Sequence, residues 1–387
     1  MSRPQSYLRP VSFFCALFAT TAVLHAQATV PTFSGPAFSS TVEELRTASA
    51  AVPPDHSIAA QILLEEGTYI VAADGTLSHQ FRVIFRVDSQ DAVANWSEIS
   101  EDWDPWFEKP AQLNARVLQA DGHFVELDQK TITDAPVKAE DVETFSSEHV
   151  RRAPLPGVAV GSIVEEVETL DEKTPYFIGG GIYRFYFRGG SPIAHVRLTV
   201  DTPSTLPFKD AISFLPNLSV TREEKDGRRH VVYDQGPQPP EYNSDIDLYT
   251  NTPNTPLVEF ATGSSWANVA STYAALADPQ TISAEAQSIL PADLPTERTA
   301  RIAAIVAKLH QEVRYTGVEF GASRLTPQKP SDVIQRHYGD CKDKATLLVA
   351  MLRAAGIPAN LALLSTGPGR DVQPTLPGLS QFNHAIV

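Results

Sequence analysis

Cysteine is nearly absent from this sequence, with only Cys15 and Cys341 among 387 residues. Cys15 lies in an N-terminal segment that has the pattern of a removable export signal, so the mature protein would hold one thiol. One thiol cannot form an internal disulfide, and a lone thiol in an exported protein is open to oxidation. What Cys341 does is therefore the first question that the sequence raises.

Positive charge is also scarce, because 31 Lys and Arg residues stand against 46 Asp and Glu, for a net charge of −15. This balance argues against general nucleic-acid binding, since a phosphate backbone would be repelled. The acidic residues are spread along the chain, which indicates solubility rather than a binding tail. After the N-terminus no apolar run is long enough to span a bilayer. The length and the 42% hydrophobic content predict about two folded domains.

The N-terminus is predicted to be a signal peptide over residues 1–28. Arg3 and Arg9 precede an apolar run from Val11 to Leu24, and a small-x-small cleavage site follows at 26–28. The run is short for a membrane span, although an uncleaved anchor remains the alternative. Bulky residues before Cys15 make a poor lipoprotein signal. We therefore expect an exported protein, periplasmic or extracellular.

Residues 55–245 have the pattern of an antiparallel β-sandwich-like domain. From Phe81 to Val87 apolar and polar residues alternate at period two, which is typical of a strand with one buried face. Asp-Gly pairs at 74–75, 121–122 and 226–227 predict hairpin turns, because both turn positions favour positive φ. Many short strands with such turns and no helical run favour a sandwich.

A Pro-rich linker is predicted over residues 246–261, and helical patterns dominate the second domain, residues 262–387. The fold class is therefore α+β with two domains. The predicted helices cover 266–276, an amphipathic stretch that starts near Thr296 and runs to Val313, a short turn at 333–337, and 341–355, which ends at Gly356 and Pro358. Strands are predicted at 359–364 and 382–387.

Cys341 is predicted to be the first residue of its helix, with Asp340 as the N-cap. Free backbone N–H groups and the positive end of the helix dipole then favour thiolate over thiol, and thiolate is the nucleophilic form. Lys342 and Lys344 would add positive charge, unless they face water. The alternative is a buried cysteine that serves as a small apolar residue. Asp340 and Asp343 also fit a capping box with no catalytic role.

A nucleophilic cysteine needs a base, and His384 is the candidate because a helix followed by strands can return it to the helix start. A third polar group normally orients such an imidazole. His337 is a competitor, but it is poorly placed to face the helix end. A metal site of Cys341, His384 and Asp340 is a weak alternative. No cofactor is expected, and the run Gly179-Gly180-Gly181 is interpreted as a turn or bulge rather than a phosphate loop.

The segment from Tyr338-Gly339-Asp340-Cys341 through Gly356-Ile357-Pro358 to Phe382-Asn383-His384 resembles the bacterial transglutaminase-like (papain-like) superfamily, over roughly Trp266 to Val387. The β region resembles the domain of unknown function that often precedes such domains in exported bacterial proteins. Arg116-Val117, Leu155 to Val158 and Gly161 to Glu165 carry that weaker similarity.

The resemblance implies a catalytic order of Cys, His and Asp, with Cys341 as nucleophile and His384 as base. The aspartate would follow on the next strand, beyond Val387, so we expect the sequence to be a fragment. Asp371 precedes His384 and does not fit the order. The implied activity is acyl transfer at an amide bond, as a protease, amidase or transglutaminase, on a protein, a peptide or a cell-wall peptide. The alternative is a non-enzymatic envelope binding or scaffold protein.

Overall fold

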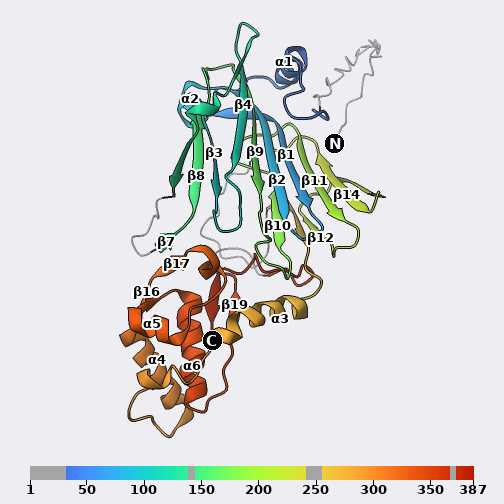
Figure 1. The fold of residues 1–387 in the computed structure, drawn as a ribbon. Helices are drawn as coiled ribbons and strands as arrows, with labels where there is room; N and C mark the ends of the chain where they lie inside the picture. The colour runs from blue at the N-terminus through green and yellow to red at the C-terminus, as the bar shows by residue number, and fades with distance from the viewer. Residues whose placement is uncertain (1–31, 138–143, 241–254, 367–371) are drawn as a thin grey trace, which may run out of the picture.

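The computed structural model describes residues 32–137, 144–240, 255–366 and 372–387. The predicted signal peptide and Asp371 lie outside these ranges. Strands make up one part of the molecule and helices α3 to α6 gather at its other end (Figure 1). This arrangement agrees with the predicted order of a β domain followed by an α+β domain.

The β domain is built on one eight-stranded sheet. In sheet order its strands are β13 (Ser219–Lys225), β14 (Arg228–Gln235), β11 (Val196–Pro203), β1 (Ala60–Val71), β2 (Leu77–Val87), β9 (Ile163–Asp171), β4 (Gln112–Leu118) and β5 (Phe124–Glu126). Neighbours pair antiparallel except β1 and β11, which are parallel. The antiparallel prediction is therefore wrong at this one pair, whose strands are joined by a long crossover rather than a hairpin.

Two smaller sheets complete the sandwich-like domain. One has the order β10 (Ile182–Tyr186), β15 (Leu257–Ala261), β12 (Lys209–Ser213), and the other has the order β3 (Glu98–Trp103), β8 (His149–Pro154), β6 (Thr133–Pro136). Aromatic residues join the layers: the ring centroids of Tyr69 on β1 and Phe260 on β15 lie 5.1 Å apart. These residues belong to the largest hydrophobic cluster, which is the core of the domain.

The predicted linker over 246–261 is wrong at its end. Residues 257–261 form β15, which is buried throughout and is the central strand of its sheet. The chain therefore returns to the β domain after the Pro-rich segment and leaves it only at Thr262. Residues 246–254 lie outside the described ranges.

The predicted Asp-Gly turns all join paired strands. Asp226 and Gly227 both have positive φ, 52° and 75°, as the turn between β13 and β14 requires. In the turns at 74–75 and 121–122 only the glycine has positive φ. The hairpins are confirmed, but only one of them has both residues in the left-handed region.

Helix α1 (Val42–Ala51) was not anticipated from the sequence. It begins with a capping box of Thr41 and Glu44, and it buries Leu45 and Ala48 against the sheet face opposite the main core. A second short helix, α2 (Gln90–Asn95), follows β2, and a 3-10 turn, η1 (Gln129–Thr131), follows β5.

The second domain packs around α6 (Cys341–Ala354), whose Leu347, Ala350 and Met351 are fully buried. The other elements are α3 (Trp266–Ala277), η2 (Asp278–Gln280), η3 (Gln287–Ile289), α4 (Arg298–Glu312), β16 (Arg314–Tyr315), β17 (Gly317–Glu319), η4 (Gly321–Arg324), α5 (Pro330–Arg336), β18 (Tyr338–Gly339), β19 (Ala362–Leu364) and β20 (His384–Ile386). The predicted helices are confirmed, and α4 begins near Thr296 as expected, with Glu297 as its N-cap.

Three short ladders involve these elements, and one of them crosses between the domains. β16 pairs with β18, and β19 pairs with β20. β17 pairs in parallel with β7 (Thr144–Ser146) of the β domain.

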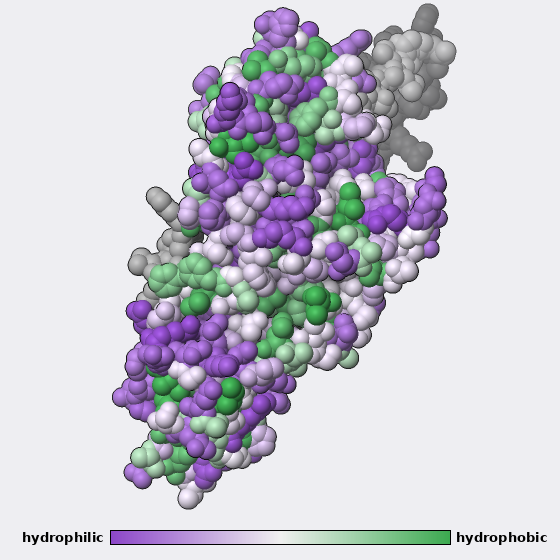
Figure 2. All heavy atoms as spheres, viewed as in Figure 1, coloured by the Kyte–Doolittle hydropathy of each residue, from purple (hydrophilic) through white to green (hydrophobic). Residues whose placement is uncertain are grey.

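The surface has polar residues over both domains, with hydrophobic residues in small groups on the face that Figure 2 shows. Within the described ranges, none of the helices has the length and apolar character needed to cross a membrane.

Candidate active site

Cys341 is the first residue of α6, and Asp340 is its N-cap, as predicted. The Asp340 carboxylate accepts a hydrogen bond from the backbone N–H of Asp343 at 3.1 Å. The residue before the cap has to be small, because a Cβ on Gly339 would lie 2.8 Å from the Cβ of Asp343. The Gly-Asp-Cys sequence therefore has a local structural reason: it allows the first turn of α6 to close tightly on β18.

The charged residues around Cys341 are paired rather than free. Lys342 is buried and forms an ion pair with Asp340, and the Lys344 ammonium donates to the carbonyl of Val313 at 2.6 Å. Burial lowers the pKa of Lys344. The alternative in which these lysines face water is wrong for both.

Asp343 does not complete a capping box. Its carboxylate accepts the backbone N–H of Gln328 at 2.8 Å and pairs with Arg336. Burial, and then the charge of Asp340, raise the pKa of Asp343. The side chain therefore ties the start of α6 to α5 and to the loop before it.

The Cys341 thiol is half-buried, and its environment raises its pKa. Burial is the largest cause and the negative charge of Asp340 is the second, while the backbone N–H groups of Ala385 and Lys342 and the charge of Lys342 act in the opposite direction. The helix start does supply N–H groups, as expected. The expectation of a lowered thiol pKa is nevertheless not met, because desolvation and the cap carboxylate together outweigh these groups.

His384 opens β20, which runs beside the start of α6. It pairs with Leu364 of β19, and the next backbone N–H, that of Ala385, donates to the Cys341 sulfur. Asn383 anchors this hairpin, because its amide group accepts from and donates to the backbone of Thr366 at 2.7 and 2.9 Å. The return from helix to strand that was expected for His384 is therefore present.

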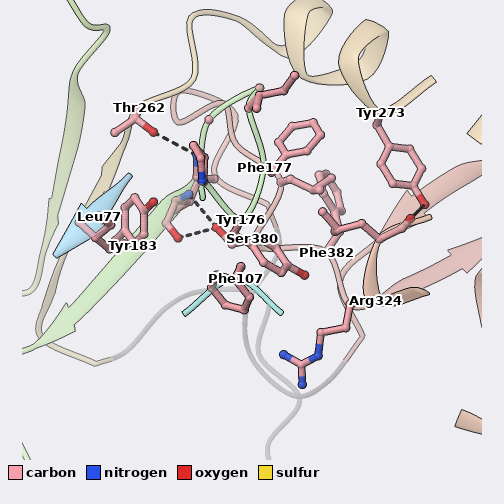
Figure 3. A pocket seen from close by; sticks show the side chains of 18 of the residues that line it. Leu77, Phe107, Tyr176, Phe177, Tyr183, Thr262, Tyr273, Arg324, Ser380 and Phe382 are labelled. Atoms are coloured by element: carbon pink, nitrogen blue, oxygen red, sulfur yellow. Dashed lines mark hydrogen bonds between the residues drawn. The ribbon is translucent and has the colours of Figure 1, made fainter. Parts of the chain in front are cut away.

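Cys341 and His384 line the same cleft, whose volume is about 970 Å³. The cleft lies between the domains, and Figure 3 shows aromatic side chains from both of them around it, including Phe107, Tyr176 and Tyr183 of the β domain and Tyr273 and Phe382 of the second domain. The structure thus brings the two predicted site residues to one cavity and supplies a wall from the β domain that the sequence did not predict.

Three further residues of the cleft were missed by sequence reasoning. Burial and then the charges of Cys341 and Asp340 raise the pKa of both Tyr273 and Tyr315, and for Tyr315 a hydrogen bond with Cys341 adds to the effect. Arg324 pairs with Asp104 and Glu148 of the β domain, each at 3.1 Å. No local motif marks these positions, so only their distance from Cys341 in space could have identified them.

His337 is not among the residues that line the cleft. His337 lies at the end of α5 with φ of 58°, and its ring contacts the carbonyl of Glu312. The metal alternative is not supported, because the described residues contain no group of three or more metal-binding side chains and Asp340 is already occupied by Lys342.

Family comparisons assign both domains. Residues 73–241 match the profile of a domain of unknown function with a solved structure, DUF3857, and residues 286–385 match the transglutaminase-like superfamily. The chain therefore contains a DUF3857 domain followed by a transglutaminase-like domain. No curated protein matches the chain.

Among solved structures, a candidate protease from Parabacteroides distasonis has the same arrangement, with a TM-score of 0.70 at 16% identity. The match covers 84% of this chain and 64% of that one, so the chain spans less than two thirds of its length. At this identity the likeness shows the fold alone. Two further matches are too distant to support an argument. Leukotriene A4 hydrolase from Saccharomyces cerevisiae has 9% identity and a TM-score of 0.28, and the match covers 52% of this chain and 29% of that one. A zinc metallopeptidase from Deinococcus radiodurans has 12% identity and a TM-score of 0.25, and the match covers 66% of this chain and 53% of that one.

Proposed function

We propose that this protein is an exported cysteine-dependent acyl-transfer enzyme that acts on amide bonds, with Cys341 as the nucleophile and His384 as the base. The observation that carries the proposal is the meeting of the α6 start and the β20 strand in one interdomain cleft. The transglutaminase-like family and the candidate protease of the same arrangement support it.

The raised thiol pKa favours a particular order of events. Cys341 rests as the neutral thiol, because burial and Asp340 disfavour the thiolate. His384 accepts the thiol proton as the sulfur attacks the carbonyl carbon of the amide. The tetrahedral adduct then collapses to a thioester, and the imidazolium gives its proton to the departing amine.

The second half of the reaction uses water as the acyl acceptor, so the proposed activity is hydrolysis. His384 takes a proton from water, which attacks the thioester and releases the acid and the free thiol. Tyr315 lies next to the sulfur, where its hydroxyl is placed to donate a hydrogen bond to the oxyanion or to the thiolate. The volume of the cleft, about 970 Å³, and its aromatic lining suit a protein, peptide or cell-wall peptide.

The test is the rate of Cys341 alkylation by iodoacetamide between pH 5 and 10, followed by mass spectrometry of the modified peptide. In the wild type the thiol should react at pH values where the His384→Ala variant no longer reacts, because His384 takes up the thiol proton as the sulfur attacks, whereas in the variant the thiol must first ionise by itself. His337→Ala is the matched control and should keep the wild-type profile.

Identical profiles for the wild type and His384→Ala would overturn the pairing. They would favour the alternative of a non-enzymatic envelope protein. Cys341→Ala then separates the two classes of protein in the organism, because an enzyme loses its function with its nucleophile and a scaffold does not.

A further inference from the structure

Three backbone segments meet beside the cleft, and we call this contact the glycine junction. Gly179–Gly181 belongs to the β domain just before β10, Thr262–Gly263 directly follows β15, and Pro377–Ser380 leads into β20. The glycine run lies in a turn, as interpreted from the sequence, because the N–H of Gly180 donates to the carbonyl of Phe177 at 3.2 Å. It is also a contact between the domains.

The segments approach so closely that a side chain cannot be accommodated. A Cβ on Gly180 would lie 2.8 Å from the carbonyl carbon of Thr262, and one on Gly263 would lie 2.9 Å from that of Pro377. A Cβ on Gly378 would lie 2.7 Å from the carbonyl carbon of Gly181. Atoms of ordinary side chains are not found at such distances from backbone, so each of the three segments depends on glycine.

Hydrogen bonds fix the same segments to one another. The N–H of Leu379 donates to the carbonyl of Gly180 at 3.1 Å. The Ser380 hydroxyl donates to the carbonyl of Ile182 at 2.7 Å and accepts the N–H of Ile182 at 2.8 Å. Thr262 binds Gly181 through its backbone N–H and its hydroxyl, both at 3.0 Å, and Figure 3 shows Thr262 and Ser380 on either side of this contact.

The junction ends four positions before His384. Within the junction, Leu379 is buried in a cluster with Phe177 of the β domain and Tyr273. Between the junction and His384, the ring of Phe382 packs edge-on against Trp266 at 5.9 Å. β20 then continues directly to the Ala385 N–H that donates to Cys341. The backbone of the β domain therefore determines where the His384 strand begins.

We propose that Ser380 and the glycine junction are positioning residues, through which the DUF3857 domain holds His384 in register with Cys341. The β domain is then a working part of the active site rather than a separate binding module. This inference rests on the proposed function, because it gives the junction its role through the Cys341 and His384 pair.

The experiment uses the full chain with Ser380→Ala, Ser380→Thr and Gly263→Ala, and two measurements. Hydrogen exchange of the peptide that covers 376–387 should rise by roughly thirtyfold in Ser380→Ala, the factor expected when two hydrogen bonds of ordinary strength are lost. The pH profile of Cys341 alkylation should shift toward that of His384→Ala. Ser380→Thr keeps a hydroxyl and should restore both measurements.

Gly189→Ala is the control, because a Cβ there meets nothing within 4 Å. It should match the wild type in both measurements. If Gly263→Ala fails to fold, the two Ser380 variants still decide the question, since they leave the backbone contact intact.

Two results would overturn the inference while the proposed function stands. The first is unchanged hydrogen exchange over 376–387 in Ser380→Ala. The second is raised exchange together with an unchanged profile of Cys341 alkylation, which would show that the junction has a structural role only. Failure of the proposed function is recognised separately, by coincident profiles of the wild type and His384→Ala, and the inference would fall with it.

Discussion

Asp340 shows how one residue can serve structure and oppose reactivity at the same time. Its carboxylate caps α6 and neutralises the buried Lys342. The same charge is the second cause, after burial, that raises the pKa of the Cys341 thiol. An uncharged N-cap residue would still cap α6, but it would not raise the pKa of the Cys341 thiol.

Asp340→Asn should therefore lower the thiol pKa, because asparagine is as good an N-cap as aspartate but carries no charge. Alkylation of Cys341 at pH 7 should be faster by roughly two- to tenfold, one pKa unit being a factor of ten. The protein should also lose stability, since Lys342 is left buried without its partner. Asp332→Asn, an exposed residue in the first turn of α5, is the control. Alkylation no faster than in the wild type would show that the cap charge does not govern the thiol.

The identity of the candidate site residues could be predicted from the sequence where the signal is local. Asp340 before Cys341 is a cap pattern, and His384 follows a helix and a strand that return the chain. The partners could not be predicted, because Arg336 and Gln328 reach Asp343 from other elements and Arg324 reaches Asp104 from the other domain. Such pairs depend on the folded topology, which no short pattern contains.

At the scale of helices and strands, too, local features could be predicted from the sequence, whereas contacts between distant segments could not. Hairpins such as β13–β14 were predictable because the turn and both strands are consecutive. The parallel pair β1 and β11 and the interdomain pair β7 and β17 join segments far apart in the chain. β15 was hidden because Pro253 and Pro256 come just before it, and proline-rich sequence indicates a linker unless the sheet that receives the strand is known.

Arg324 connects elements of both domains next to the cleft, and its loss tests their coupling. Arg324→Ala leaves Asp104, whose side chain is 2% exposed, without a cation. We expect the free energy of unfolding to fall by about 3 kcal/mol, the cost of breaking a buried pair. The control is Arg222→Ala, whose pair with Asp210 is half-exposed and worth about 1 kcal/mol at most. Urea unfolding measures both, and equal losses would show that the interdomain pair is no more than a surface ion pair.

At the scale of the whole molecule, the β domain carries carboxyl groups on the core-facing side of its main sheet. Glu166 and Glu168 share this side of β9 with the buried Val164, and the cross-strand neighbours of Glu168 are Phe81 on β2 and Leu113 on β4. Burial, and then the charges of Glu166 and Glu101, raise the pKa of Glu168 to about 9. Burial raises that of Glu166 to about 8.

These groups make the stability of the protein depend on pH in a direction that is unusual for carboxylates. In the unfolded chain Glu168 ionises near 4.5, whereas in the folded protein it stays protonated up to about pH 9. Unfolding between these values therefore releases a proton, so the free energy of unfolding should decrease as the pH rises and level off above about 9. Each proton released in this way lowers the free energy of unfolding by at most about 1.4 kcal/mol per pH unit.

Glu168→Gln removes this ionisation, since the amide has a similar shape and no charge. The variant should lose less stability than the wild type between pH 5 and 9, and it should be the more stable protein at pH 9. Glu224→Gln, at a side chain that is 61% exposed on β13, should keep the wild-type slope. Urea unfolding at pH 5, 7 and 9 measures the three slopes. Parallel slopes for the wild type and Glu168→Gln would mean that Glu168 reaches water in the folded protein, and that the core side of the sheet is more open than its apolar neighbours indicate.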